Sequence, residues 1–347
     1  MKTLWSKKER ALTPYVAGEQ PKLDNIVKLN TNENAYPPSP KVFEAIHAVR
    51  ALQKYPPPDA DAFRAAAAAF CGVGERNVFC ANGSDEALAL CFQAFFDPDE
   101  PVACPEVTYS FYRVWAQLYD IPLYSVPLKA DWTIDVQAMC GCRNAVFANP
   151  NAPTGCVMSL EEIEQIARST PGVVIVDEAY IAFGGKTALP LLDRHENIVI
   201  VRTLSKSHAL AGMRAGYVGA HEQLICALQT VKDSFNSYPI DSVAQAAAAA
   251  ALADRAYYEK TAGKIVATRE RTVRALTEMG AEVLPSGANF IFVRCADAKK
   301  TFLQLRERGI IVRYFDSVLT RDFLRVTIGT DEQMERFLAA FQEINGR

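Results

Sequence analysis

The sequence predicts an α/β fold: a mostly parallel central sheet with helices on both faces, followed by a smaller α+β domain. The first observation is a set of short apolar runs bounded by polar or turn residues, which are typical of strands buried on both faces of a parallel sheet. The second is that helix signals alternate with these runs. The runs are Asn77–Cys80, Pro101–Cys104, Ala145–Ala148, Val173–Val176 and Ile198–Val201.

Polar residues mark the helix boundaries of this first region. An apolar-periodic helix follows Asn82-Gly83-Ser84-Asp85-Glu86 and ends near Phe96, where Asp97-Pro98 stops it. Ser159 and Glu162 have the spacing of a capping box, which predicts that a helix starts there. Residues 1–60 are rich in Pro and Asn, so we expect this stretch to be mostly extended.

A second region begins near residue 255. A long charged helix is expected over Tyr257–Gly280, and a final helix after a capping box formed by Thr330 and Gln333. Strands are expected over Phe290–Val293, Ile310–Val312 and Phe323–Ile328. We therefore expect a large domain over residues 31–255, a small C-terminal domain over 256–347, and an N-terminal segment, 1–30, that packs on the small domain.

Composition excludes several classes of function. The 347 residues carry 37 Lys and Arg against 40 Asp and Glu, a net charge of −3, so no nucleic-acid surface is expected. No apolar stretch approaches the roughly 20 residues of a membrane helix, and the charged N-terminus does not resemble a secretion signal. The nine scattered cysteines indicate reduced thiols of a cytoplasmic protein. Only Cys140 and Cys142 are close together, without the partners of a zinc site, so no metal is expected.

Polar residues that sheet packing does not require follow the predicted strands, and ligands bind at the carboxyl ends of strands in open α/β sheets. Ser84 and Asp85 lie in a turn that opens a helix, where free backbone N–H groups suit a phosphate. Asp177 comes directly after a buried strand, where an unpaired carboxylate is costly. Lys206 follows another strand and could form a Schiff base with a carbonyl. Each has an ordinary alternative: a helix cap, a surface ion pair or a solvated loop lysine.

Neighbouring residues complete this pattern. Thr203, Ser205 and Arg214 would add two hydroxyls and a cation to a phosphate cradle. The turn Asn149–Gly155 is made rigid by two prolines, and an asparagine amide there could reach a ring hydroxyl, although a plain turn is the alternative. Together the strand ends compose a site for a phosphorylated aldehyde held by a lysine, with a carboxylate facing a protonated ring nitrogen. Pyridoxal phosphate has that chemistry.

A series of motifs extends the pattern along the chain: Leu12–Tyr15, Leu29–Asn34, Tyr55-Pro56, Asn82–Glu86, Thr108–Tyr112, Pro153–Gly155, Asp177–Tyr180, Thr203–Lys206, Leu210–Arg214 and Leu324–Thr330. On these motifs the chain resembles the fold-type-I pyridoxal-phosphate aminotransferases over nearly its whole length. Within them it is most similar to the histidinol-phosphate aminotransferases.

The resemblance implies roles for individual residues. Lys206 would hold the cofactor and move the substrate proton, Asp177 would pair with the pyridinium nitrogen, and Tyr180 would hydrogen-bond the ring hydroxyl. The implied cofactor-binding residues are Ser84, Asp85, Tyr109, Asn151, Thr203, Ser205, Arg214 and Tyr55. Tyr55 would reach the cofactor of the neighbouring subunit in a homodimer. The implied substrate-binding residues are Tyr15, Asn32, Arg313 and Arg325.

One position departs from the family pattern. The family has an asparagine immediately before Pro-Thr-Gly, and this asparagine holds the ring hydroxyl; here the position is Ala152. Either Asn151 takes its place, or Tyr180 does the work alone.

The resemblance also implies an activity. Glutamate would give its amino group to the cofactor and leave as 2-oxoglutarate, and imidazole acetol phosphate would then receive the nitrogen to give histidinol phosphate, in histidine biosynthesis. An aromatic amino acid aminotransferase, or an enzyme like phosphothreonine decarboxylase, is the alternative on the same scaffold. A cofactor-sensing regulator is disfavoured, because no basic helix-turn-helix segment precedes Tyr15. An α/β binding protein with a merely exposed Lys206 is the remaining non-catalytic alternative.

Overall fold

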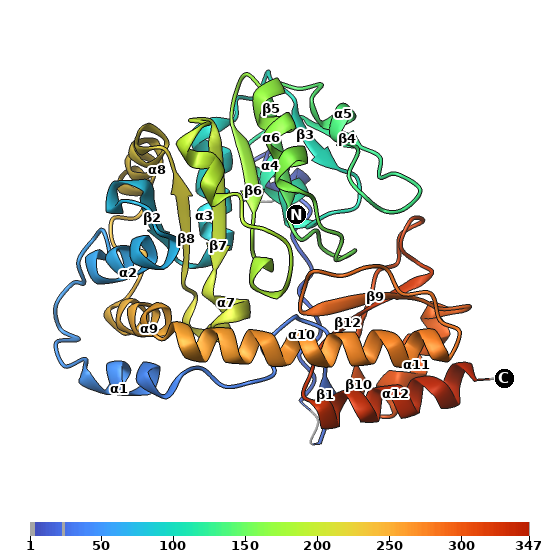
Figure 1. Ribbon diagram of the computed structural model, residues 1–347. Coiled ribbons are helices and arrows are strands. Elements are labelled where there is room, and N and C mark those ends of the chain that lie inside the picture. The colour runs from blue at the N-terminus through green and yellow to red at the C-terminus, as the bar shows by residue number, and fades with distance from the viewer. Residues whose placement is uncertain (1–3, 23–24, 347) are drawn as a thin grey trace.

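The computed structural model describes residues 4–22 and 25–346, and its largest element is a seven-stranded sheet (Figure 1). Every neighbouring pair is parallel except the two pairs that involve β8, which runs antiparallel to both of its neighbours. The mostly parallel sheet expected from the sequence is confirmed. Its strands, in spatial order, are β2 (Val78–Ala81), β8 (Gly216–Ala220), β7 (Ile198–Thr203), β6 (Val174–Asp177), β5 (Asn144–Ala148), β3 (Val102–Pro105) and β4 (Leu123–Val126).

Helices cover both faces of this sheet, because successive strand residues point to opposite sides. On one face, Ile175 and Val199 belong to a core that packs under α3 (Gly83–Phe95), α4 (Phe111–Leu118) and α8 (Glu222–Phe235). On the other face, Val176 and Ile200 pack under α6 (Leu160–Ser169) and α5 (Val136–Met139). The β2 end of this second face is covered by α1 (Pro40–Ala48), α2 (Asp61–Cys71) and α9 (Ser242–Ala253).

A second, smaller core lies beyond this sheet. It surrounds an antiparallel sheet in the order β11 (Arg313–Tyr314), β12 (Phe323–Thr327) and β9 (Phe290–Arg294), with α11 (Ala298–Glu307) and α12 (Asp331–Asn345). The helix α10 (Arg255–Glu278) runs beneath both cores and joins them (Figure 1). The remaining helices are short: α7 (Leu204–Ser207) and the 3₁₀ turns η1 (Glu9–Ala11), η2 (Glu75–Asn77), η3 (Ile181–Phe183), η4 (Leu189–Asp193) and η5 (Ala211–Met213).

The N-terminal segment contacts both parts of the molecule. Its beginning lies on the large part, where the backbone N–H of Thr13 donates to Gln117 Oε1 at 3.0 Å. Further along, Glu19 pairs with Arg306 of α11, and β1 (Val27–Lys28) pairs in parallel with β10 (Ile310–Ile311). The segment therefore crosses the opening between the two cores.

The capping boxes expected from the sequence are both present. Ser159 Oγ accepts from the backbone N–H of Glu162, and Thr330 Oγ1 accepts from that of Gln333, with the reciprocal bonds also formed. In the part of the chain that the structure describes, none of the helices combines the length and apolarity that crossing a bilayer requires.

Candidate active site

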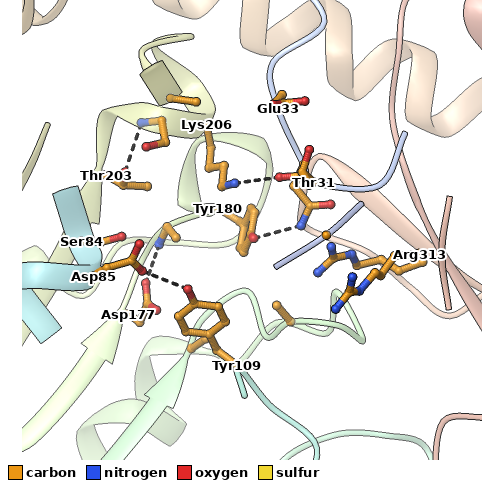
Figure 2. A pocket seen from close by; sticks show the side chains of 18 of the residues that line it. Thr31, Glu33, Ser84, Asp85, Tyr109, Asp177, Tyr180, Thr203, Lys206 and Arg313 are labelled. Carbon is orange, nitrogen blue, oxygen red and sulfur yellow. Dashed lines mark hydrogen bonds between the residues drawn. The ribbon is translucent and has the colours of Figure 1, made fainter. Parts of the chain in front are cut away.

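Polar residues from the strand ends meet in one cavity of about 240 Å³ (Figure 2). The ends of β6 and β7 and the start of α3 form one wall, since these strands share a direction and end at the same sheet edge. The small sheet and the N-terminal segment form the opposite wall. The residues expected from the sequence that line the cavity are Tyr15, Asn32, Ser84, Asp85, Tyr109, Asp177, Tyr180, Thr203, Ser205, Lys206, Arg214, Arg313 and Arg325.

Asp177 is the last residue of β6 and is 4% exposed. One carboxylate oxygen accepts from the backbone N–H of Ala179 at 3.0 Å, and the other accepts from the Tyr112 hydroxyl at 2.9 Å. Burial raises the pKa of Asp177 to about 6, while these two hydrogen bonds act in the opposite direction. Near neutral pH the side chain is therefore mostly a carboxylate, and it can hold a proton on a basic ring nitrogen.

Lys206 lies on α7, directly after the strand next to β6. Its Nζ donates to the backbone oxygen of Thr31 at 3.0 Å. Burial lowers the pKa of Lys206 to about 8, and the positive charge of Arg325 adds to this effect, while the carboxylates of Asp85 and Glu33 oppose it. A larger fraction of the side chain is thus a neutral amine, which is the form that attacks a carbonyl group.

The start of α3 could hold an anion, and we call it the anion cradle. Arg214, in the left-handed conformation with φ +51°, places its guanidinium over the helix start, so that a Cβ on Gly83 would lie 2.9 Å from Nη2. On the other side, a Cβ on Gly216 would lie 2.6 Å from the Ser84 nitrogen, so only glycine lets β8 approach this closely. A guanidinium beside the N-terminus of a helix is repelled by the positive end of the helix dipole. An anion bound between the guanidinium and the helix N-terminus is attracted by both, which makes the arrangement favourable.

Asp85 has a structural role that the sequence did not predict. One carboxylate oxygen accepts from the Tyr109 hydroxyl at 2.9 Å, and the other accepts from Arg214 Nη2 at 3.0 Å. Asp85 therefore fixes the aromatic ring at the cavity wall and the guanidinium of the anion cradle together.

Tyr180 presents its hydroxyl to the cavity. Asn32 Nδ2 donates to that hydroxyl at 2.9 Å, and Asn32 Oδ1 accepts from Thr327 Oγ1 at 3.0 Å. Because the Tyr180 oxygen accepts one bond, its hydrogen is available for an acceptor in the cavity. Through these contacts Asn32 orients the Tyr180 hydroxyl. The expected role of Asn32 in substrate binding stays a prediction.

Asn151 does not reach the cavity. It is 1% exposed, and its amide nitrogen donates to the Val107 oxygen at 2.9 Å and to Thr154 Oγ1 at 3.1 Å. Its amide oxygen accepts from Thr108 Oγ1 at 2.7 Å. The neighbouring Ala152 is the residue that lines the cavity instead, so Tyr180 is the one of the two alternatives that faces the site.

Tyr55 lies away from the cavity of its own chain. Its side chain is 82% exposed, and its ring stacks on Tyr238 with the centroids 4.7 Å apart. The expected contact of Tyr55 with a neighbouring subunit therefore stays a prediction.

Two arginines face the cavity from the small sheet. Arg313 and Arg325 are directly opposite each other across β11 and β12, which is unfavourable for like charges unless an anion lies between them. Arg325 Nη2 donates to the Asn30 backbone oxygen at 2.9 Å, and its buried Nε has no partner among the described residues. Burial lowers the pKa of Arg325, and Arg313 adds to this effect. The pair is suited to binding carboxylate or phosphate oxygens.

A wider cavity of about 840 Å³ continues from the first. The two share Tyr15, Tyr109, Ala152 and both arginines, and the wider one extends along residues 314–320. Tyr15 stacks on Phe111 here, with ring centroids 4.6 Å apart. A substrate longer than its reacting end has room in this direction.

The family model for aminotransferases of class I and II matches residues 24–341. The chain belongs to this family. The histidinol-phosphate aminotransferase of Acinetobacter baumannii (strain SDF) is 49% identical, over 98% of this chain and 96% of that relative. Histidinol-phosphate aminotransferase 2 of Dechloromonas aromatica is 48% identical over the whole of both chains.

Solved structures agree with this family membership. The crystal structure of histidinol-phosphate aminotransferase from Sinorhizobium meliloti in complex with pyridoxal-5′-phosphate superposes with a TM-score of 0.89, at 26% identity. The alignment covers 99% of this chain and 98% of that one. This aminotransferase has three features that fit pyridoxal phosphate: an anion cradle at α3, a buried carboxylate suited to a ring nitrogen, and an amine suited to an aldehyde.

Proposed function

We propose that this aminotransferase uses pyridoxal phosphate to transfer an amino group between glutamate and imidazole acetol phosphate, with 2-oxoglutarate and histidinol phosphate as the products. The observation that carries the proposal is that Lys206, Asp177 and two cross-strand arginines line a single cavity. The curated relatives of that name, 48–49% identical over nearly their whole length, support the choice of substrate.

When bound, the cofactor supplies an aldehyde for the amino group and a ring that accepts the electron pair left when the substrate loses its Cα proton. Lys206 Nζ, with a pKa of about 8, is the base that removes this proton and returns it. Asp177 would keep the ring nitrogen protonated, and the Tyr180 hydroxyl would donate to the ring oxygen. Ser84, Thr203, Ser205, Arg214 and the amides at the start of α3 would hold the phosphate.

The two substrates must bind in turn at one place. Glutamate presents carboxylates and imidazole acetol phosphate presents a phosphate, so the cations of Arg313 and Arg325 serve both. Tyr15 lines both cavities, as the two arginines do, and would contact the phosphate-bearing substrate.

A panel of amino donors and keto acceptors tests this proposal. Imidazole acetol phosphate with glutamate should give the highest kcat/KM, and Arg313→Gln should raise KM for this acceptor by at least about tenfold, while Arg321→Gln, an exposed control, should not. If phenylpyruvate is preferred by orders of magnitude, the proposed substrate is wrong and the aminotransferase class remains.

Aromatic amino acids are the second candidate substrates. Tyr15, Tyr109 and Phe315 line the wider cavity and offer apolar ring surface beside the arginines. The same panel separates the two candidates, since an aromatic substrate carries no distal anion.

We also propose that the protein is a cytoplasmic homodimer with shared active sites. The exposed Tyr55–Tyr238 pair, with Leu52 and Phe235 also exposed nearby in the sequence, offers apolar surface for a second copy. The nine cysteines are free thiols, as in a reducing compartment.

A further inference from the structure

Tyr112 lies directly behind the Asp177 carboxylate. It is on the first turn of α4 and is fully buried, with its ring packed against Phe92 and Trp115. Its hydroxyl donates to Asp177 Oδ2 at 2.9 Å. Tyr112 is not among the residues that line the cavity, and its hydrogen bond to the site is the one to Asp177.

The surroundings of Asp177 make this hydrogen bond important. Burial favours the neutral acid, and the carboxylates of Asp85 on α3 and of Glu178, the residue after β6, act in the same direction. The same cavity is also lined by the titratable or charged side chains of Tyr15, Glu33, Tyr109, Tyr180, Lys206, Arg214, Arg313 and Arg325. Against burial and the carboxylates, the Tyr112 hydroxyl is the largest opposing influence on the pKa of Asp177, followed by the backbone N–H of Ala179.

Tyr112 also contacts Tyr109, which lies two residues before the start of the same helix. The two rings meet edge to face, 5.6 Å apart at 88°. Burial raises the pKa of both phenols well above 10, so both remain donors, Tyr109 to Asp85 and Tyr112 to Asp177. One short segment thus orients two carboxylates of the site.

We propose that Tyr112 is a positioning residue whose hydroxyl holds the Asp177 side chain in its charged form and turned toward the cavity. The value of this arrangement for catalysis rests on the proposed function. The hydrogen bond itself belongs to the cofactor-free chain and can be tested there.

The direct test is Tyr112→Phe, which keeps the ring and removes the hydroxyl. Carbon-13 NMR titration of labelled aspartate carboxyls in the cofactor-free protein, with Asp177→Asn to assign the signal, measures the Asp177 pKa. We expect a rise of about one pH unit in Tyr112→Phe, since a hydrogen bond to a charged group contributes that order of free energy. Tyr119→Phe, at the end of the same helix, should leave the Asp177 pKa unchanged. An unchanged pKa in Tyr112→Phe overturns the proposal.

A double-mutant cycle on cofactor affinity gives the second readout. At pH 7, Tyr112→Phe should weaken binding of pyridoxal phosphate about twofold when Asp177 is present, because a pKa raised from about 6 by one unit lowers the charged fraction of Asp177 from about nine-tenths to about one-half. It should add no further loss in Asp177→Asn. Equal losses in both backgrounds would show that Tyr112 acts only through packing. If neither the parent nor any variant binds the cofactor, the proposed function fails. The carboxyl titration still shows whether the Tyr112 hydroxyl stabilises the charged form of Asp177.

Discussion

Lys206 and Asp177 are held in surroundings that oppose their charged forms. The pKa of Lys206 is lowered from 10.5 to about 8, so the unfolded chain binds more protons between these values and stability rises with pH across that window. The pKa of Asp177 is raised from 3.8 to about 6, so its contribution to stability is present at low pH and is lost as pH rises through about 6. At pH 7 both residues therefore destabilise the cofactor-free fold.

This predicts a gain of stability from a loss of function. Lys206→Met should raise the unfolding free energy of the cofactor-free protein at pH 7 by about 1 to 3 kcal/mol, because no buried ammonium remains, and should abolish transamination. Urea unfolding measures the change, and the advantage should shrink as pH rises from about 8 to 10.5. Lys186→Met, at an exposed lysine, is the control. A variant no more stable than the parent would contradict the depressed pKa.

Some of the residues that face the cavity could be predicted from the sequence, because their chemistry is unusual at the end of a buried strand. Lys206, Asp177 and Arg214 follow from unusual polar residues at strand ends. The choice between Asn151 and Tyr180 could not be made in advance, because it depends on the bonds that Asn151 forms with Val107, Thr108 and Thr154. Tyr112 is the last residue of the Thr108–Tyr112 motif, but its contact with Asp177 could not be predicted, because the two residues are 65 positions apart in the sequence.

At the scale of elements, a buried ion pair aligns the two strands that carry the site. Glu178 follows Asp177 and points to the other side, where Arg202 of β7 donates to it from Nη2 at 2.7 Å and from Nε at 3.0 Å. Thr187 and the backbone of Ala188 also donate to Glu178. The pair fixes the ends of β6 and β7, and with them Asp177 and the segment that leads to Lys206.

Breaking this pair should be costly. Arg202→Met leaves a buried carboxylate unpaired and should destabilise the protein by about 3 to 5 kcal/mol. Arg168→Met, which removes an exposed partner of Glu164, should cost less than about 1 kcal/mol. Chemical unfolding of both variants checks the difference, and equal effects would mean that Arg202 does not hold the strands.

Local signals predicted the elements best. Both capping boxes are encoded within four residues and were found in place. β8 was missed, since Gly216 and Gly219 weaken a strand signal and the first of these is required by a contact with α3. β4 was missed because it is a half-exposed edge strand.

At the scale of the whole molecule, the site is assembled from segments far apart in the sequence. The N-terminal segment supplies Tyr15, the large sheet supplies Asp177, the helix α7 that follows it supplies Lys206, and the small sheet supplies both arginines. The mostly parallel sheet with a smaller α+β part could be predicted from apolar periodicity. The wider cavity could not, because its walls depend on how the two parts meet.

The proposed dimer predicts complementation between two inactive chains. Mixing Lys206→Ala chains with Tyr55→Ala chains should restore up to about one quarter of parental activity, because a mixed dimer contains one intact site. Each variant alone should be inactive or weakly active, and activity assays after subunit exchange measure the recovery. No recovery, despite mixed dimers seen by native mass spectrometry, would argue against shared sites.

Borohydride reduction of the purified protein with pyridoxal phosphate, followed by peptide mapping, tests the central claim most directly. The account predicts a pyridoxyl group on the peptide that contains Lys206, absent from Lys206→Ala. An unmodified Lys206 peptide, or a label on another lysine that persists in Lys206→Ala, would contradict it.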